Sequence, residues 1–390
     1  MTTDSPPVPR RAPPAAGQGA GPSPRRRALF RVVAGLGALL VVLVIGELGA
    51  RMQPAARLPL APHYDPRLLE IEWVDVPGGG HAPVYRAGQV TSQCYDRSVG
   101  RPRAWDRETV APDGTPIGCL TYRISERGFR DIGDSPAPAR ASAPERGTIA
   151  IVGDSFTFGE GVMDPERTSD ALARELAARA PGRYGVVNRG LQGLNLELAL
   201  GIYRARIRAE DPAIVVYAFV PNDAQPFGET LRDETFLRAA PWRLPDSMGG
   251  GWCRGCAWVS RRVGALRTTR ATIEHVRASF EGASGARFDA LLAALARDVA
   301  ADGARLVILE FPMTPGMSGD PARYPFGFVH EHLAAAAAKL GVPVVDVHPA
   351  IASWPRERVW THPTDPHPSP EVHALAAQAL AERILAGSRS

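Results

Sequence analysis

The chain has 390 residues, which suits one large domain or two small ones and is enough to bury a sizeable core. Its net charge of +4 is concentrated at the N-terminus, because the first 31 residues contain six arginines and one aspartate. The rest of the chain is therefore close to neutral. This charge distribution excludes the basic surface of a nucleic-acid-binding protein, and no nucleic-acid partner is expected.

The N-terminus predicts a membrane segment. Residues 1–31 are rich in proline, glycine, alanine and arginine and predict a disordered basic tail in the cytoplasm. Residues 32–50 contain the apolar run VVAGLGALLVVLVIG, which approaches the ~20 residues that a spanning helix needs. Because arginines precede the run, we predict a single-pass signal anchor that exports the following domain to a periplasm or the exterior. A cleaved signal peptide, which would release a secreted protein, is the alternative.

The cysteine content agrees with export. Four cysteines are an even number, which suggests disulfide bonds in an exported chain. The preferred pairing joins Cys94 to Cys119 and Cys253 to Cys256, although three connectivities are possible. A thioredoxin-like role for the sequence CRGC would need a surrounding βαβ pattern, and a four-cysteine zinc site would need a second close pair. The sequence supplies neither.

The apolar pattern divides the remaining chain in two. Residues 51–147 have short, weakly alternating runs among prolines and glycines, and we expect an irregular, partly β region that wraps the main domain. Residues 148–388 contain five continuous runs rich in valine and isoleucine, which is typical of parallel strands covered on both faces. The predicted strands are residues 148–152, 184–188, 213–219, 304–311 and 342–347. Helical patterns between them predict an α/β domain with a mostly parallel sheet.

Two further segments complete the predicted domain. The last helix has Ser369 as its N-cap and Pro370 at its first position, and it ends before Gly387. Residues 224–283 interrupt the alternation after the third strand, and their sequence predicts a helix near 257–280. Ligands bind at the carboxyl ends of strands in open α/β sheets, so this insertion could form a lid or a wall of the substrate site. The alternative is a surface loop with no role in the site.

Chemistry-bearing residues follow the predicted strands. The first strand runs into Gly-Asp-Ser and places Ser155 at its carboxyl end. A phosphate site there would need a Walker-type lysine or a G-x-G-x-x-G fingerprint, and neither is present. Later segments add Gly193 in NRGLQG, Asn222 in VPND, and Asp365 and His367 in DPHPS. Together they provide the nucleophile, base, carboxylate and oxyanion donors that acyl transfer needs.

In this order the blocks GDSFTFG, NRGLQG, VPND and DPHPS resemble those of the SGNH hydrolases, also called the GDSL esterase/lipase family. The resemblance covers about residues 150–386. The segment YRISERGFRD, residues 122–131, is similar to a lead-in found in membrane-anchored bacterial members. The resemblance implies a flavodoxin-like three-layer α/β/α fold with a five-stranded, mostly parallel sheet.

The resemblance also implies roles for single residues. Ser155 would be the nucleophile, and its backbone N–H would form an oxyanion hole with Gly193 and the Asn222 amide. His367 would be the base, with Asp365 as its partner. No cofactor is implied. A metal site in the segment that contains His362, Asp365, His367 and His373 is not expected either, because prolines and turn residues crowd it.

Two positions depart from the family pattern. Val220 stands where the third block usually has glycine, and a β-branched residue is costly at positive φ, so the loop that carries Asn222 is expected to differ locally. Asp365 lies two residues before His367, whereas the aspartate of the family usually lies three residues before its histidine. If the shorter spacing fails to reach the far ring nitrogen, His367 would act in a dyad or with another acid.

The resemblance and the predicted anchor together imply an exported, membrane-anchored serine esterase. Its substrate would be an ester-bearing carbohydrate or another envelope component, with acetyl as the first choice of acyl group. An O-acyltransferase that uses the same residues to acylate a sugar hydroxyl is one alternative. A domain that has lost catalysis and serves in binding or assembly is another.

Overall fold

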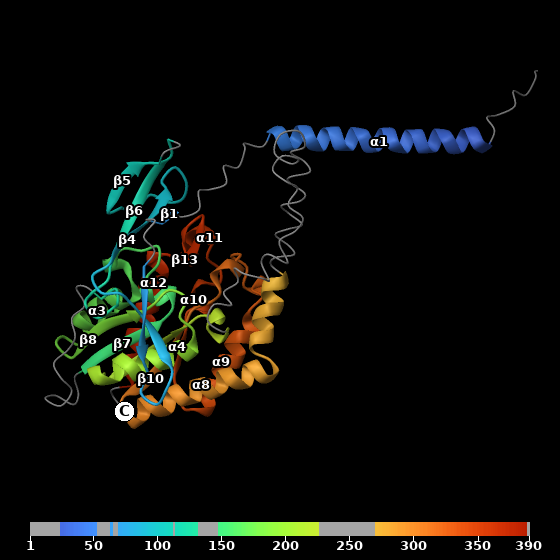
Figure 1. The fold of residues 1–390 in the computed structure, drawn as a ribbon. Helices are drawn as coiled ribbons and strands as arrows, with labels where there is room; N and C mark the ends of the chain where they lie inside the picture. Colours follow the sequence, from blue (N-terminus) through green and yellow to red (C-terminus); the bar gives the residue numbers. More distant parts are fainter. Residues whose placement is uncertain are drawn as a thin grey trace, which may run out of the picture. The chain divides into compact units, whose positions relative to one another are not determined.

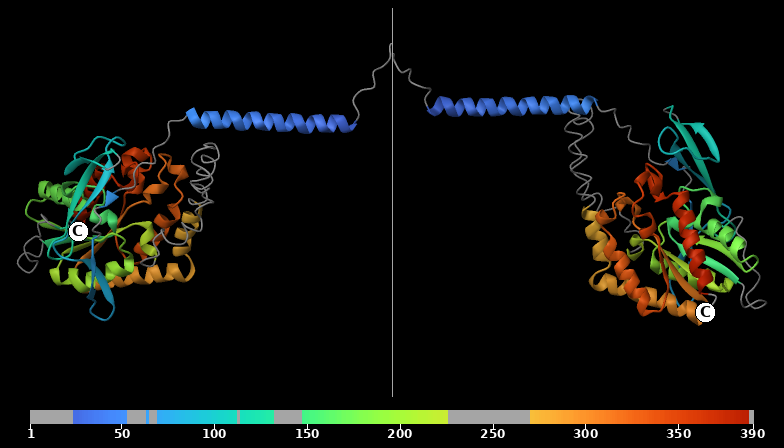
Figure 2. Two further views of the ribbon diagram at one scale, coloured as in Figure 1. Left: turned by 45° about the horizontal axis from the view of Figure 1, so that its top comes forward. Right: turned by 180° about the vertical axis from the view of Figure 1, so that it is seen from behind.

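The computed structural model describes residues 24–52, 63–64, 69–111, 114–131, 147–225 and 270–387 (Figures 1 and 2). The N-terminal helix belongs to one compact unit, and the described residues from His63 onward belong to another. Most of the insertion at 224–283, together with Cys253 and Cys256, lies outside the described residues. Residues 270–279, which fall within the helix predicted near 257–280, are helical.

The N-terminal helix α1 (Pro24–Met52) is longer than the sequence predicted. It begins at Pro24, so the residues from 24 to 31 that were expected in a disordered tail form its first turns. Within it, Ala28–Gly49 has a mean hydropathy of 2.6. By length and composition this segment is able to cross a membrane, and an N-terminal signal sequence has the same properties.

A five-stranded parallel sheet forms the centre of the second unit and confirms the predicted fold class (Figure 1). Its order is β11-β10-β9-β7-β8, and the strands are β7 (Gly147–Gly153), β8 (Tyr184–Gly190), β9 (Ile214–Phe219), β10 (Arg305–Glu310) and β11 (Val344–Asp346). Every residue of β7 and β9 is buried, which explains why these strands have continuous rather than alternating apolar sequences.

Helices cover both faces of this sheet. Along β7, Ile149 and Ile151 face one layer, whereas Ala150 and Val152 face the other. The first layer contains α3 (Thr168–Arg179) and α12 (Pro370–Ala386), and the second contains α4 (Leu196–Ile202), α8 (Gly282–Ala301) and α9 (Gly327–Lys339). The arrangement is a three-layer α/β/α domain. Ser369 caps α12 as predicted, because its hydroxyl accepts from the Val372 N–H at 3.4 Å.

The region before the sheet is more regular than the irregular segment that the sequence suggested. An antiparallel sheet has the order β1-β4-β6-β5, formed by β1 (His63–Tyr64), β4 (Val90–Asp96), β5 (Arg107–Val110) and β6 (Pro116–Arg123). A separate hairpin pairs β2 (Ile71–Asp75) with β3 (His81–Tyr85). Side chains of β3, β4 and β6 join the core of the α4, α8 and α9 layer, so this region packs on the main domain.

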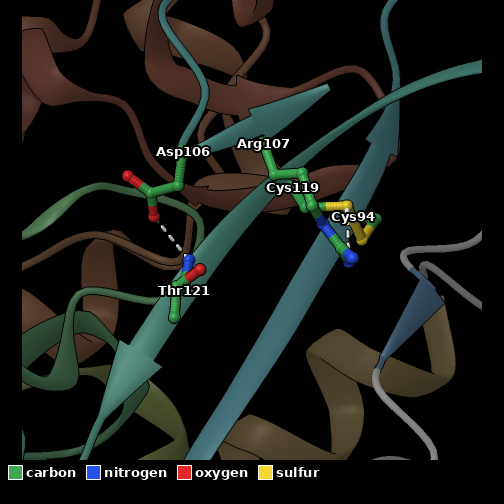
Figure 3. The surroundings of a disulfide bond; sticks show 5 residues. All are labelled: Cys94, Asp106, Arg107, Cys119 and Thr121. Atoms are coloured by element: carbon green, nitrogen blue, oxygen red, sulfur yellow. Dashed lines mark hydrogen bonds between the residues drawn. A yellow bond between two sulfur atoms is a disulfide. The ribbon is translucent and has the colours of Figure 1, made fainter. Parts of the chain in front are cut away.

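A disulfide joins β4 to β6. Cys94 and Cys119 are opposite each other in the register and are bonded, which is one of the two predicted pairs (Figure 3). The Arg107 guanidinium lies 3.9 Å from the Cys119 sulfur. The Thr121 N–H donates to the Asp106 carboxylate at 2.6 Å, which fastens the start of β5 to β6 (Figure 3). The disulfide therefore ties β4 to β6, and the hydrogen bond ties the start of β5 to β6.

Short elements complete the described chain. They are α2 (Ser155–Phe158), η2 (Asp164–Glu166), η3 (Tyr203–Ile207), η4 (Arg208–Glu210), η5 (Pro221–Ala224), η6 (Thr314–Gly316), η7 (Pro321–Arg323), α10 (His348–Ile351), α11 (Arg356–Val359), β12 (Trp360–His362) and β13 (Asp365–Pro368). The β12–β13 hairpin lies directly before α12 and carries the last sequence block.

Candidate active site

Ser155 is the first residue of α2, immediately after the carboxyl end of β7. The turn is tight: a Cβ at Gly153 would collide with the Thr157 hydroxyl and the Ala218 carbonyl. Asp154 caps the short helix, because its carboxylate accepts from the Phe156 N–H at 2.9 Å. The strand therefore stops at Gly-Asp-Ser because glycine permits the close approach and aspartate begins the helix. Ser155 remains partly exposed at the sheet edge.

Asp365 and His367 lie in the extended strand β13. Side chains two residues apart in a strand point to the same side, so the shortened spacing brings the two together. The Asp365 Oδ1 atom lies 2.5 Å from His367 Nδ1 and also accepts from the His367 backbone N–H at 3.0 Å. His367 Nε2 lies 2.9 Å from Ser155 Oγ. The three side chains form a continuous hydrogen-bonded chain.

Charge and burial determine the protonation states of His367 and Asp365. Burial lowers the pKa of His367, but the negative charges of Asp365 and Glu160 outweigh it and raise the pKa to about 10. Burial raises the pKa of Asp365, but the charge and hydrogen bonds of His367 reverse this and hold it below its ordinary value. The arrangement therefore stabilises an imidazolium beside a carboxylate, which is the state that forms when a histidine accepts a proton.

Gly193 and Asn222 follow the strands on either side of β7. Gly193 lies in the turn after β8 with φ +73°, and Asn222 lies in η5 after β9. Val220 has φ −128°, which a β-branched residue adopts without strain, so its replacement of glycine imposes no cost here. Because β8 and β9 flank β7, both residues lie at the same sheet edge as Ser155.

A sequence model of the GDSL-like lipase/acylhydrolase family matches residues 151–375, which is more than half of the chain. The chain belongs to this family. It is a hydrolase that acts on ester bonds, and the match includes every block described above.

Solved structures from the same group of enzymes are similar. A lipase/acylhydrolase from Enterococcus faecalis is 16% identical with a TM-score of 0.38, over 62% of this chain and 96% of that one. The esterase EstA from Pseudoalteromonas sp. is 14% identical with a TM-score of 0.38, over 62% of this chain and 99% of EstA. A catalytic mutant of the acetylxylan esterase Axe2 from Geobacillus stearothermophilus is 16% identical with a TM-score of 0.38, over 61% of this chain and 93% of Axe2. No curated protein gives a significant match. These values are low, so the assignment rests on the family match.

A second carboxylate, Glu160, lies beside the histidine and was not predicted. Its Oε2 atom is 3.5 Å from His367 Nε2, and its side chain is buried. Gln192 donates to the same carboxylate at 2.8 Å, and the Tyr85 hydroxyl of β3 contacts the Gln192 amide oxygen at 3.2 Å. The available signal was a glutamate between two glycines just after the nucleophile block, in GDSFTFGEG.

Strand β4 supplies the outer partners of Asp365. The Tyr95 hydroxyl donates to Asp365 Oδ2 at 2.5 Å, and the Gln93 amide donates to the same oxygen at 3.3 Å. The Tyr122 hydroxyl of β6 donates to the side-chain oxygen Oε1 of Gln93 and accepts from the Gly161 N–H at 2.8 Å. Tyr95 and Gln93 are almost fully buried. The N-terminal region of this esterase therefore orients the carboxylate that contacts His367.

Arg130, in the GFRD sequence at residues 128–131, stabilises the segment that begins with Ser155. The Arg130 guanidinium is 1% exposed and donates to the carbonyls of Phe158, Gly159 and Val162 at 3.2, 2.6 and 2.8 Å. These carbonyls lie at the end of α2 and in the turn that follows it. Asp164 provides the counter-charge at 2.8 Å. Arg130 thus fixes the segment that begins with Ser155.

Two groups of side chains in the described residues have the composition of metal ligands. Glu160, Asp365 and His367 form one, and His330, Asp346 and His348 form the other. In the first group, His367 Nδ1 contacts Asp365 and Nε2 contacts Ser155. A metal ion on this imidazole would displace one of these two contacts, so the first group suits proton transfer better than metal binding.

Proposed function

We propose that the protein is an exported, membrane-anchored serine esterase that removes acyl groups, acetyl in particular, from a carbohydrate or another envelope substrate. The observation that carries the proposal is the hydrogen-bonded chain in which His367 Nε2 lies 2.9 Å from Ser155 Oγ and Nδ1 lies 2.5 Å from Asp365. The distance between His367 and Ser155 is within the range for proton transfer between a nucleophile and its base.

In this mechanism, His367 in its neutral form takes the Ser155 hydroxyl proton as the oxygen attacks the ester carbonyl. The backbone N–H groups of Ser155 and Gly193 and the Asn222 amide stabilise the resulting oxyanion. The imidazolium, held by Asp365, gives its proton to the departing alcohol and leaves an acyl-enzyme. Water then repeats the sequence on the acyl-enzyme, which releases the acid and restores the serine.

The cellular location of the enzyme limits which substrates it can reach. Helix α1 is apolar enough to span a membrane, and the Cys94–Cys119 disulfide suits an oxidising compartment outside the cytoplasm. An uncleaved helix would keep the enzyme at the membrane surface, where envelope components are concentrated. We therefore favour an ester carried by a surface carbohydrate over a freely diffusing substrate.

Ester hydrolysis by the full-length protein in detergent tests the proposal. We would measure release of p-nitrophenol from acetate, butyrate and longer esters, with Ser155→Ala beside Ser318→Ala, a matched replacement of an exposed serine. We expect turnover that is highest for acetate, lost in Ser155→Ala and retained in Ser318→Ala. Equal turnover by the Ser155→Ala variant would refute the assignment of the nucleophile.

Acyl transfer gives a different result in the same assay. Formation of an acetyl-enzyme on Ser155 that turns over faster with added sugar than with water would favour an O-acyltransferase. Absence of both turnover and acyl-enzyme would favour a domain that only binds. Intact-mass measurement after mixing with the acetate ester distinguishes these outcomes, because the acyl-enzyme carries the mass of one acetyl group.

A further inference from the structure

A cluster of unassigned polar side chains lies at the carboxyl ends of β10 and β11. Glu310 ends β10 and pairs in register with Asp346, which ends β11. His330 lies in the first turn of α9, and His348 begins α10 directly after β11. Four side chains from different elements therefore meet at one end of the sheet.

The separations within the cluster suit one shared ion. His330 Nδ1 lies 3.0 Å from Glu310 Oε1 and 3.2 Å from Asp346 Oδ2. Donor atoms of His330, Asp346 and His348 all lie within 4.8 Å of one another. Ligands bound tetrahedrally to zinc at ~2.1 Å are about 3.4 Å apart, which is close to the two distances from His330 Nδ1.

The donor atoms lack other partners. Glu310 Oε1, His330 Nδ1 and His348 Nε2 are each buried, and none has a well-directed hydrogen bond in the described part of the chain. The Glu310 side chain is 1% exposed. Glu310 Oε1 and His330 Nδ1 contact only each other and Asp346, and His348 Nε2 has no hydrogen bond in the described part of the chain. Buried polar atoms are normally satisfied, so this cluster indicates a shared ligand.

Neighbouring groups hold two of the side chains in place. Asp346 Oδ1 accepts from the His348 backbone N–H at 2.8 Å, which leaves Oδ2 facing His330. The Tyr324 hydroxyl lies 3.2 Å from His330 Nε2, and its ring stacks on His348 with centroids 4.1 Å apart. Metal-binding histidines characteristically use their second ring nitrogen in such a contact.

We propose that Glu310, His330, Asp346 and His348 bind a single divalent transition-metal ion, for which Zn²⁺ is the best fit. Two imidazoles and two carboxylates are a ligand set that zinc accepts in tetrahedral geometry. The charge of the ion would balance the two carboxylates. With all four positions filled by protein, the site would have a structural role and would fasten α9 and α10 to the sheet.

The competing arrangement has no metal. Burial lowers the pKa of His330, but Asp346 and Glu310 reverse this and raise it to about 9, so an imidazolium between two carboxylates is self-consistent. This ion pair accounts for His330 but leaves the His348 nitrogen unsatisfied. A metal ion would give a partner to the ring nitrogens of both His330 and His348.

Titration with Zn²⁺ alone tests the proposal on the full-length protein, after treatment with a chelator and without reductant. We would compare the wild type with His348→Gln and with His332→Gln. His332 lies on α9 like His330 but pairs with Asp289. We expect one Zn²⁺ per chain and a raised Tm, with Kd about 100-fold weaker or worse in His348→Gln and unchanged in His332→Gln. Circular dichroism establishes that each variant is folded.

Other results would overturn the proposal. They are the absence of saturable binding to the wild type, or equal affinity in the wild type and the folded His348→Gln variant. Asp365→Asn separates this site from the other candidate group, because it alters the catalytic chain and should leave zinc affinity unchanged. Cobalt provides a second readout, since Co²⁺ in a tetrahedral site absorbs strongly in the visible range and the His348→Gln variant should lack that absorption.

Discussion

The contact between Tyr95 and Asp365 predicts that a residue of the N-terminal region controls the rate of catalysis. In Tyr95→Phe the ring stays and only the hydroxyl is lost. Asp365 Oδ2 would then keep the Gln93 amide, at 3.3 Å, and lose its 2.5 Å donor. A hydrogen bond to a charged group contributes about 1.5–3 kcal/mol, so the free energy of unfolding should fall by about that amount.

Only part of this loss should appear in catalysis, because Asp365 is charged both before and during the reaction. We expect kcat to fall about tenfold with KM unchanged, well short of the ~10⁴-fold loss seen when a triad carboxylate is replaced by an amide. Tyr203→Phe is the matched control, because its hydroxyl donates to Asp302 at 2.6 Å, remote from the sheet edge. It should lose similar stability and no activity.

Steady-state kinetics with p-nitrophenyl acetate and urea denaturation of both variants measure these effects. If Tyr95→Phe retains kcat within twofold of the wild type, or if Tyr203→Phe loses as much activity, Tyr95 does not position Asp365 for catalysis. A loss that appears in KM alone would also contradict it, because Tyr95 lies behind the carboxylate and not beside the substrate.

Three further predictions follow from the site. Glu160→Gln removes one of the charges that raise the pKa of His367, so the pH at which kcat/KM begins to rise should move down by about one unit, and an unchanged profile would exclude Glu160 from the site. Replacing Cys119 by serine breaks the disulfide and should lower the free energy of unfolding by about 3 kcal/mol in urea titrations. The same change should reduce kcat, because β4 carries the outer partners of Asp365; normal activity would show that β4 needs no such fastening. Asn222→Ala should lower kcat about 10²- to 10³-fold with little change in KM, and a change confined to KM would argue against an oxyanion role.

Much of the central domain was predictable because its signals are local. Continuous apolar runs identify buried parallel strands, and all five predicted strands form in the expected sheet. The blocks with Ser155, Asn222 and His367 stand out because each follows a strand or precedes a helix. Their convergence at one edge is a property of parallel sheets rather than of these residues.

The remaining parts depend on contacts between distant segments. Tyr95 and Asp365 are 270 residues apart in the chain, and nothing near Tyr95 in the sequence indicates its partner. The region before residue 147 was predicted only as irregular and partly β, and its regular sheet was not foreseen for a related reason. Its strands are short and bury side chains against the main domain, so they lack a clean two-residue alternation. The histidines of the proposed zinc site likewise have no spacing typical of a metal motif.

The central claim is that Ser155 is the nucleophile activated by His367, and covalent labelling tests it most directly. Diethyl p-nitrophenyl phosphate reacts with an activated serine, which gains a diethylphosphoryl group as p-nitrophenolate leaves. We predict one adduct per chain, mapped by peptide mass spectrometry to Ser155, and greatly slowed labelling in His367→Ala. An adduct on another residue, or labelling of Ser155 at the same rate without His367, would contradict the account.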